Sequence, residues 1–595
     1  MRKAQLLTIS MQPTQPIIQL WHHINPRRRR QFGLLLVLMV IASFTEILSI
    51  GAVLPFLGVL TAPVLIFEHP SAQFIIQRFG LTEPAQLLLP ISIAFGVAVI
   101  LAMVLRLMLM WTNSRLSYAT GADLSMSIYR RTLFQPYRVH IIGNTSEVIN
   151  SITNGTDIVI GIINNVLNLI STSVMLIVII IALLSIEPVV TLAAFSGFGL
   201  IYAFIIWVIR KRLLSNSQCI TRESTQLIKS LQEGLGGIRD VLIDGSQDTF
   251  CQIYRNADQP LRHAQGDNNF IANSPRYAME AFGILLIVTL AYIIAQKTDG
   301  ISKVIPTVGV LAFGSQRLLP IMQQAYAAWS YIRGFQASMI DVLKALDQPL
   351  PAYADQSVVQ PLPFKHHITL KQLSFRYSQQ TQWVLKNINL TIAKGSRIGF
   401  IGTTGSGKST LLDIVMGLLQ PTKGGLVIDN QPVTVGNHRA WQVHIAHVPQ
   451  AIFLADSSIE ENIAFGVPKD QIDRQRVRQA AQQAQIADTI ENWPEQYQTF
   501  VGERGIRLSG GQRQRIGIAR ALYKQADVII FDEATSALDN ETELAVMQAI
   551  EDLSKDFTLL IIAHRLTTLK SCTQIVELGE GGIKRTGSYQ HYEPS

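Results

Sequence analysis

The sequence predicts a bundle of six membrane-spanning helices followed by an α/β domain that holds a phosphate-binding loop. Hydrophobic residues make up 48% of the 595 residues and charged residues only 15%, whereas soluble domains average about 25% charged. The apolar residues gather into long runs in the first half, and a glycine-rich loop follows a strand pattern in the second half. This composition excludes a disordered chain. The three scattered cysteines are too few for a disulfide framework or a zinc site.

The first half of the chain contains six apolar runs, each close to the roughly 20 residues that cross a bilayer. These runs are 32–60, 87–111, 164–185, 189–209, 278–295 and 304–322. Prolines and polar residues mark a linker after them, and alternating strand patterns begin beyond it. The predicted organisation is an N-terminal segment 1–31, a membrane domain 32–346, a linker 347–364 and an α/β domain 365–595.

Positive charge predicts the orientation of the spans. Lysine and arginine number 19 in the segments on the N-terminal side of the membrane and 3 on the opposite side, so the N-terminus and the α/β domain are expected in the cytoplasm. The run Arg27–Arg30 is interpreted as a topology anchor, with a specific anionic-lipid site as the alternative. Two long cytoplasmic connections contain short turns, near 136–143 and 233–240, that could contact a cytoplasmic domain.

Ionisable residues inside the predicted spans are candidates for substrate contact, because burying charge in lipid is costly. Three arginines in one chain suit an anionic cargo such as a pyrophosphate group. The alternative is that the arginines extend to the cytoplasmic interface or pair with the glutamates. The candidates are Glu46, Arg106, Arg276, Glu280 and Arg317.

The second half contains the motif G-x-x-x-x-G-K-[ST], with a strand pattern before it and a helix pattern after it. Its glycines let backbone N–H groups crowd around phosphates, and the helix N-terminus adds positive potential. Lys408 is expected to reach the β and γ phosphates, and Ser409 to bind Mg²⁺. The predicted phosphate-site residues are Gly402, Thr403, Thr404, Gly405, Ser406, Gly407, Lys408, Ser409 and Thr410.

Two further motifs complete a nucleotide site. The apolar run 528–531 ends in two carboxylates, of which Asp532 can hold Mg²⁺ and Glu533 can orient or deprotonate an attacking water. A second anion-binding helix start is predicted at Ser509, Gly510, Gly511 and Gln512. One chain already has a phosphate loop, so a second site for the same phosphate implies a second copy of the domain.

Together these motifs resemble the ATPase domains of ABC transporters, and the resemblance covers the whole α/β domain. It implies ATP and Mg²⁺ as cofactors. It also implies roles for four more residues: Tyr377 stacks on adenine, Gln450 meets Mg²⁺, Asp539 lies in the loop after the catalytic strand, and His564 contacts the γ-phosphate.

Six spans ahead of one such domain look like the half-transporter layout of ABC exporters. That resemblance implies a homodimer with two ATP molecules sandwiched between the subunits, and turns of the membrane domain that act as coupling helices. Short motifs at 43–46, 275–280 and 317–320 are similar to bacterial flippases for lipid-linked oligosaccharides. Related exporters of polysaccharides, lipids and drugs share the layout. A bacterial inner membrane is the expected location.

Two other classes of function compete with export. A soluble ATPase acting on nucleic acid would suit the net charge of +8, but the distribution of charge around the spans argues against it. An ATP-gated channel or regulator would use the same domains, yet the set Gln450, Glu533 and His564 favours turnover. We therefore expect an amphipathic or lipid-linked anionic substrate and membrane lipids as partners, and no nucleic acid. The histidines at 22, 23, 366, 367, 444 and 447 are expected at the surface or in loops.

Overall fold

The computed structural model describes residues 14–52, 82–186, 188–295, 318–355, 359–533, 557–563 and 566–592, with Phe56, Val59, Val64, Phe67, Ile76 and Glu543 in addition. The side chains of some residues in the long helices, Glu46 among them, lie outside the description. The chain forms two compact units. The first comprises 1–134 and 144–350, and the second comprises 135–143 and 351–595.

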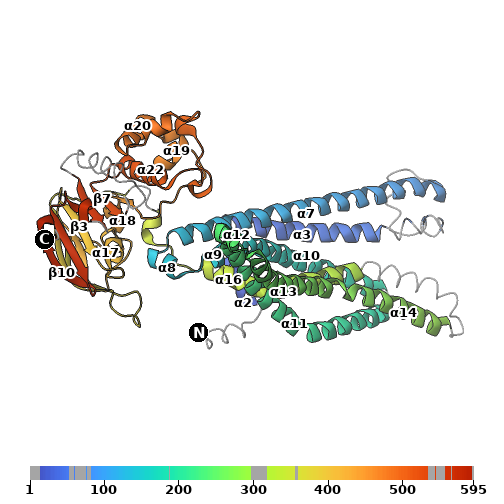
Figure 1. Cartoon of the computed structure of the whole chain (residues 1–595). Coiled ribbons are helices and arrows are strands. Elements are labelled where there is room, and N and C mark those ends of the chain that lie inside the picture. Colours follow the sequence, from blue (N-terminus) through green and yellow to red (C-terminus); the bar gives the residue numbers. More distant parts are fainter. Residues whose placement is uncertain are drawn as a thin grey trace. The chain divides into compact units, whose positions relative to one another are not determined.

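The first unit is helical. It contains α2 (Thr14–His23), α3 (Pro26–Gly51), α7 (Leu88–Leu133), α9 (Thr145–Asn150), α10 (Thr156–Ile186), α11 (Pro188–Gly236), α12 (Ile238–Ile243), α13 (Gln247–Asn273), α14 (Pro275–Ala295) and α16 (Gln336–Leu346). Figure 1 shows α3 and α7 running along each other, and the clustered side chains that they bury agree with this.

The long helices account for the predicted spans and continue beyond them. Five of the six apolar runs lie largely on α3, α7, α10, α11 and α14, and the sixth falls mostly outside the described residues. The described stretches Pro84–Leu133 and Thr145–Ile181 are long and apolar enough to cross a membrane. At 1.5 Å per residue, the 46 residues of α7 extend about 69 Å, more than twice the roughly 30 Å of a bilayer core.

Close packing at one end of this bundle fixes how its helices pair. Leu124 and Ile128 of α7 are buried with Val159 and Ile162 of α10. Gly121 permits this approach, because a Cβ there would lie 2.2 Å from Cγ1 of Ile160. Any larger residue at Gly121 would force α7 and α10 apart.

The second unit is built on two sheets. A six-stranded sheet has the order β10-β9-β3-β8-β7-β6, in which only β10 is antiparallel to its neighbour. A four-stranded antiparallel sheet has the order β2-β1-β4-β5. The strands are β1 (His367–Phe375), β2 (Leu385–Ala393), β3 (Arg397–Gly402), β4 (Lys423–Ile428), β5 (Gln431–Pro432), β6 (Ile445–Val448), β7 (Val528–Asp532), β8 (Thr558–Ile562), β9 (Gln574–Gly579) and β10 (Gly582–Gly587).

Helices complete this unit in two places, as Figure 1 shows. Between the sheets, α17 (Lys408–Val415) buries Leu411, Leu412 and Ile414 in one hydrophobic core. A second core contains buried residues of α19 (Ile459–Ile463), α20 (Arg474–Gln483), α21 (Ala487–Glu491) and α22 (Gly510–Tyr523). Two short helices remain, α8 (Tyr137–Ile142) and α18 (His438–Gln442). The parallel strands all end at the edge of the sheet that carries the loop before α17, which is where open α/β sheets bind ligands.

Candidate functional site

The loop between β3 and α17 requires glycine for steric reasons. Gly402, Gly405 and Gly407 have φ angles of +145°, +82° and +97°, which lie in the region that side-chain-bearing residues rarely adopt. A Cβ on Gly402 would also lie 2.3 Å from the carbonyl oxygen of Leu578. The strand, loop and helix predicted for this motif are therefore present, with the helix beginning at Lys408.

The polar groups inside this loop fit a phosphate ligand. Lys408 is buried, and its Nζ donates hydrogen bonds to the carbonyl oxygens of Gly402 (2.8 Å) and Thr403 (3.0 Å). The Ser406 hydroxyl is buried and has no hydrogen-bond partner in the described part of the chain. An ammonium group, an unpartnered hydroxyl and the first N–H groups of α17 together offer several donors to an anion.

The two predicted carboxylates, Asp532 and Glu533, lie at the end of β7 next to this loop. The side chain of Gln450 donates a 2.6 Å hydrogen bond from Nε2 to Oε2 of Glu533. Burial and the neighbouring Glu533 raise the pKa of Asp532, while Lys408 and a hydrogen bond with Ser409 act in the opposite direction. The structure thus brings together five of the residues that the sequence assigns to one site.

Ser409 and Asp532 offer the kind of oxygen ligands that Mg²⁺ prefers. Magnesium in phosphate sites is usually held by one or two carboxylates together with water and phosphate oxygens. In the described residues, no group of three or more His, Cys, Asp or Glu could hold a metal ion by itself. The donor set here therefore fits a magnesium ion that arrives with its phosphate ligand.

The predicted aromatic residue Tyr377 lies next to this helix. Its hydroxyl is 3.1 Å from Oγ1 of Thr410, and its ring meets Phe375 edge-on with centroids 5.0 Å apart. Residues 135–143 belong to the same compact unit, and the guanidinium of Arg138 donates a hydrogen bond to the Tyr377 carbonyl. The turn predicted near 136–143 is therefore part of the C-terminal unit and contains α8.

Sequence reasoning missed Asp413, which lies on α17 one turn beyond Ser409. Burial, with a smaller contribution from Asp532, raises the pKa of Asp413 to about 6. Burial and the charge of Asp413 in turn raise the pKa of Tyr137 on α8. The i, i+4 spacing from Ser409 was the available signal, because it places both side chains on one face of the helix.

The second predicted anion-binding helix start is Ser509 at the N-terminus of α22. Its hydroxyl accepts a 3.2 Å hydrogen bond from the backbone N–H of Gln512, and the Gln512 side chain accepts a 2.9 Å bond from the Ser509 N–H. This reciprocal capping box fixes the helix start. Gly510 and Gly511 follow directly. Buried residues of α22 belong to the second core, which also contains residues of α19, α20 and α21, whereas those of α17 belong to the core between the sheets. Figure 1 shows the two helices apart.

The candidate substrate residues in the membrane half are described only in part. Arg276 and Glu280, one turn apart on α14, form an ion pair of 2.7 Å. Arg106 is exposed on α7. The side chain of Glu46 and all of Arg317 lie outside the described residues, as do Asp539 and His564 of the predicted nucleotide site.

His447 departs from the expected surface or loop position, and His444 lies in a turn, as expected, but is largely buried. His447 lies on β6, where burial lowers its pKa. His444 is largely buried just before β6, with Nδ1 bonded to the Asp527 carboxylate and Nε2 2.7 Å from the Leu362 carbonyl oxygen. Lys394 reaches both Asp527 (3.4 Å) and the Phe364 carbonyl (3.1 Å). These contacts bind the end of the linker to the edge of the sheet. The sequence did not predict them, because the residues involved are far apart along the chain.

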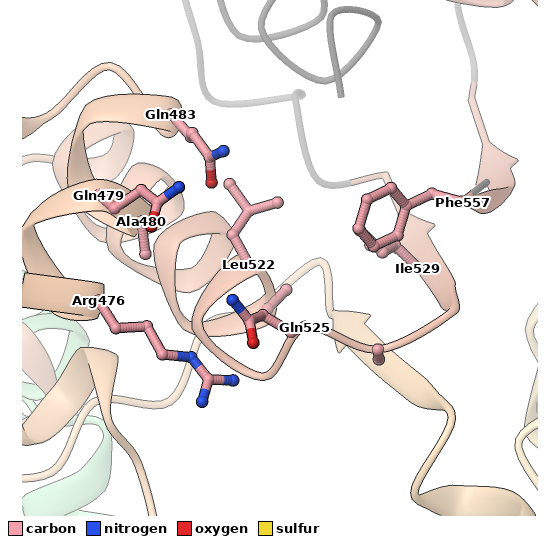
Figure 2. Close-up of a pocket in the computed structure, with 10 residues that line it drawn as sticks. Arg476, Gln479, Ala480, Gln483, Leu522, Gln525, Ile529 and Phe557 are labelled. Atoms are coloured by element: carbon pink, nitrogen blue, oxygen red, sulfur yellow. The ribbon is translucent and has the colours of Figure 1, made fainter. Parts of the chain in front are cut away.

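A pocket of 310 Å³ lies elsewhere in this unit, between α20, α22 and the starts of β7 and β8. Figure 2 shows Arg476, Gln479 and Gln483 on one side of it and Phe557 on the other. None of the predicted nucleotide-site residues lines it. The loop before α17 and the end of β7 therefore define the candidate site better than this pocket does.

Comparison with protein families matches both halves of the chain. Residues 32–304 match the family described as "ABC transporter transmembrane region", and residues 385–536 match the family described as "ABC transporter". The two matches cover the long helices and the site described above. They identify the N-terminal half as a membrane region with several helical spans.

Individual relatives agree with these matches. A protein of Alkalilimnicola ehrlichii named "ATP-dependent lipid A-core flippase" is 30% identical over 66% of this chain and 66% of its own length. The "Heterocyst differentiation ATP-binding protein HepA" of a Nostoc species is 30% identical over 64% of this chain and 62% of its own length. The chain thus matches about two thirds of the length of these two relatives.

A solved structure shows the same fold. The structure of a bacterial Atm1-family ABC exporter with ATP bound aligns with a TM-score of 0.76 at 23% identity. The alignment covers 95% of this chain and 96% of the other. Both the membrane half and the α/β half therefore follow one known architecture.

Proposed function

Because the chain belongs to the ABC transporter family and joins the membrane region to the ATPase domain in one polypeptide, we propose that it is an ATP-driven exporter that works as a homodimer. Its substrate is an amphipathic, anionic lipid, and a lipid-linked oligosaccharide or polysaccharide precursor is the first candidate. The expected location is a bacterial inner membrane with the ATPase domain in the cytoplasm.

The observation that carries this proposal is the cluster at the start of α17. Lys408, Ser409, Asp532, Glu533 and Gln450 come from three separate stretches of sequence and are linked by hydrogen bonds or charge. A cluster that only stabilised the fold would not need a buried lysine beside a loop that glycine alone can form. Phosphoryl transfer requires this set of groups.

Each residue of the cluster has a role in the proposed hydrolysis. Lys408 and the N–H groups of the loop bind phosphate oxygens, and Tyr377 stacks on the adenine ring. Ser409 and Asp532 would hold Mg²⁺, which would supply charge neutralisation at the phosphates. Glu533 accepts a proton from the attacking water, and Gln450 holds the Glu533 carboxylate in position. Hydrolysis rests mainly on positioning and charge stabilisation.

The proposed homodimer is supported by the placement of α17 and α22 in two different cores of the unit. The α22 N-terminus, fixed by the capping box at Ser509, is proposed to bind an anion. In the proposed dimer, this helix start closes over ATP that is bound by the loop of the other subunit. Asp539 and His564 would complete each of the two composite sites.

Two short helices are proposed to couple hydrolysis to transport. Residues 135–143 already belong to the ATPase unit and place Arg138 on the Tyr377 backbone. The second turn carries α12, where Leu242 and Ile243 are exposed, and we assign it to the ATPase domain of the partner subunit. ATP-driven closure of the two domains then moves the spans between two arrangements.

The substrate assignment rests on charge in the membrane half and on the names of the relatives. Lipid A-core flippases, as named, act on an amphipathic lipid. Arg106, Arg276 and Arg317 are proposed to meet an anionic head group, with Glu46 and Glu280 positioning them. The ion pair between Arg276 and Glu280 favours a second candidate, an exporter of less charged lipids or drugs, because it satisfies Arg276 within the protein.

Reconstitution tests the proposal. Purified protein in liposomes should form dimers in Mg·ATP and hydrolyse ATP faster when a pyrophosphate-linked lipid sugar is present. The same lipid sugar without pyrophosphate is the matched control. Equal stimulation by both would favour the second candidate. Continued monomer at saturating Mg·ATP, or ATP-dependent ion conduction without transport, would contradict export and favour a regulator or channel.

A further inference from the structure

The four consecutive arginines at the start of α3 do not share one environment. Arg28 bonds through Nε to the Asp123 carboxylate on α7 at 2.9 Å. Arg29 donates to the carbonyl oxygens of His22 (2.7 Å) and Ile24 (2.9 Å), at and just beyond the last residues of α2. Such contacts to the last carbonyls of a helix are stabilising. Arg28 and Arg29 therefore hold the corner between α2, α3 and α7.

Arg27 and Arg30 lie on a different face of α3 from Arg28 and Arg29. Both are exposed, and neither guanidinium has an ion-pair or hydrogen-bond partner within the residues that the structure describes. Their i, i+3 spacing puts them on one face of α3. The opposite face carries Phe32, Leu35 and Met39, which are all buried.

An exposed apolar stripe continues directly from these two arginines. Leu34, Val37, Ile41 and Phe44 follow at helical spacing, and their exposed fractions run from 46% to 71%. Leu34 begins about 6 Å beyond Arg30 along the helix axis. The described stripe is about 15 Å long, half the thickness of a bilayer core. On one face of α3, charged side chains are thus followed by apolar ones about one helical turn further along.

We propose that Arg27 and Arg30 form a binding site for the phosphate groups of anionic lipids in the cytoplasmic leaflet. Both charges are placed at head-group level by the apolar stripe next to them. Exposed Ile18 and Trp21 of α2 lie at the same corner, and tryptophan prefers the membrane interface. Arginine matches the geometry of phosphate oxygens. This inference goes beyond the proposed export and is independent of the cargo.

The apolar stripe decides between lipid and other acidic partners. A soluble acidic protein would neutralise Arg27 and Arg30 but would leave Leu34 to Phe44 uncovered. A second copy of this chain would bring two like-charged arginine pairs together. An anionic lipid covers both parts at once, because its phosphate meets the arginines and its chains meet the stripe.

Native mass spectrometry of the full-length protein in detergent, with added phosphatidylglycerol and phosphatidylcholine, tests the site. Wild-type protein should retain phosphatidylglycerol preferentially. The double variant R27Q/R30Q should lower that preference by about tenfold or more, since each arginine near a membrane surface contributes attraction to anionic lipid. R27K/R30K should keep most of it. The matched control R255Q/K365Q removes the same charge from two exposed positions and should leave the preference unchanged.

Each outcome decides the proposal. An unchanged preference in R27Q/R30Q, or an equal loss in R255Q/K365Q, would overturn it. A lower dimer fraction with unchanged lipid preference would assign the face to a second copy instead. If the double variant does not fold, the single variants R27Q and R30Q give the same test, and salt should weaken the wild-type preference more than theirs.

Discussion

The nucleotide loop and the membrane arginines are the two places where this chain concentrates candidate chemistry, and they are organised differently. At the loop, backbone and side chains form one site. Gly402 has a positive φ angle, Lys408 is buried, and Gln450 donates a hydrogen bond to Glu533. In the membrane half, Arg276 is exposed and paired with Glu280 four residues away. When a short motif sets the backbone of a binding site, the motif predicts which ligand binds there. Single side chains on a helix form no such motif, so the ligand of the membrane arginines has to be found by experiment.

The largest effect is expected at the nucleotide loop, from Glu533→Gln. Glutamine keeps the shape and can still bond to Gln450, but it cannot accept a proton. ATP hydrolysis by the purified protein should fall about 100-fold or more, while ATP binding persists. Phosphate release and nucleotide binding measure the two properties. Glu580→Gln, a change in the turn between β9 and β10, is the control, and a Glu533→Gln enzyme with normal turnover would remove Glu533 from its role.

A smaller effect, on transport, is expected from changes to the Arg276–Glu280 pair in the membrane half. If Arg276 meets the cargo, Arg276→Gln should lower transport about tenfold with basal ATP hydrolysis largely intact. Glu280→Gln removes only the group that positions Arg276 and should lower transport by a smaller factor. If the ion pair is structural, both single variants should lose transport alike and the double variant should recover it. Transport of a fluorescent lipid-linked substrate into proteoliposomes separates the two cases.

The smallest effect is expected where the linker meets the sheet. Burial alone would raise the pKa of Asp527, but His444 and Lys394 hold it below its ordinary value. A depressed carboxyl pKa stabilises the folded state above the unfolded-state value near 4, and this stability is lost as pH falls through the folded-state value. Asp527→Asn should therefore lower the melting midpoint at pH 7 by about 2 °C.

The same experiment at lower pH checks the sign. The difference between wild type and Asp527→Asn should shrink below about pH 4. Exposed Asp470→Asn is the control and should leave the midpoint unchanged. A wild-type midpoint at pH 7 in Asp527→Asn would show that the contact between Asp527 and His444 adds no stability.

What the sequence predicted depends on how local each signal is. The strand, loop and helix around Lys408 and the carboxylates after β7 were predictable, because each is set by a few adjacent residues. The turn at 136–143 was predictable from the length of its connection. The contact of His444 with Asp527, 83 residues away, was not, since strand pairing creates it. The division of the Arg27–Arg30 run also needed the position of Asp123 on another helix.

The C-terminal unit is discontinuous along the chain, since 135–143 interrupts the other unit and lies with 351–595. The polypeptide therefore passes between the units three times. Cutting the proline-rich stretch would sever one of these passages and leave the other two intact. A fragment that starts at Pro351 would be missing one of its own pieces, with the backbone oxygen of Tyr377 uncovered. Nucleotide affinity measured on such a fragment would describe an incomplete site.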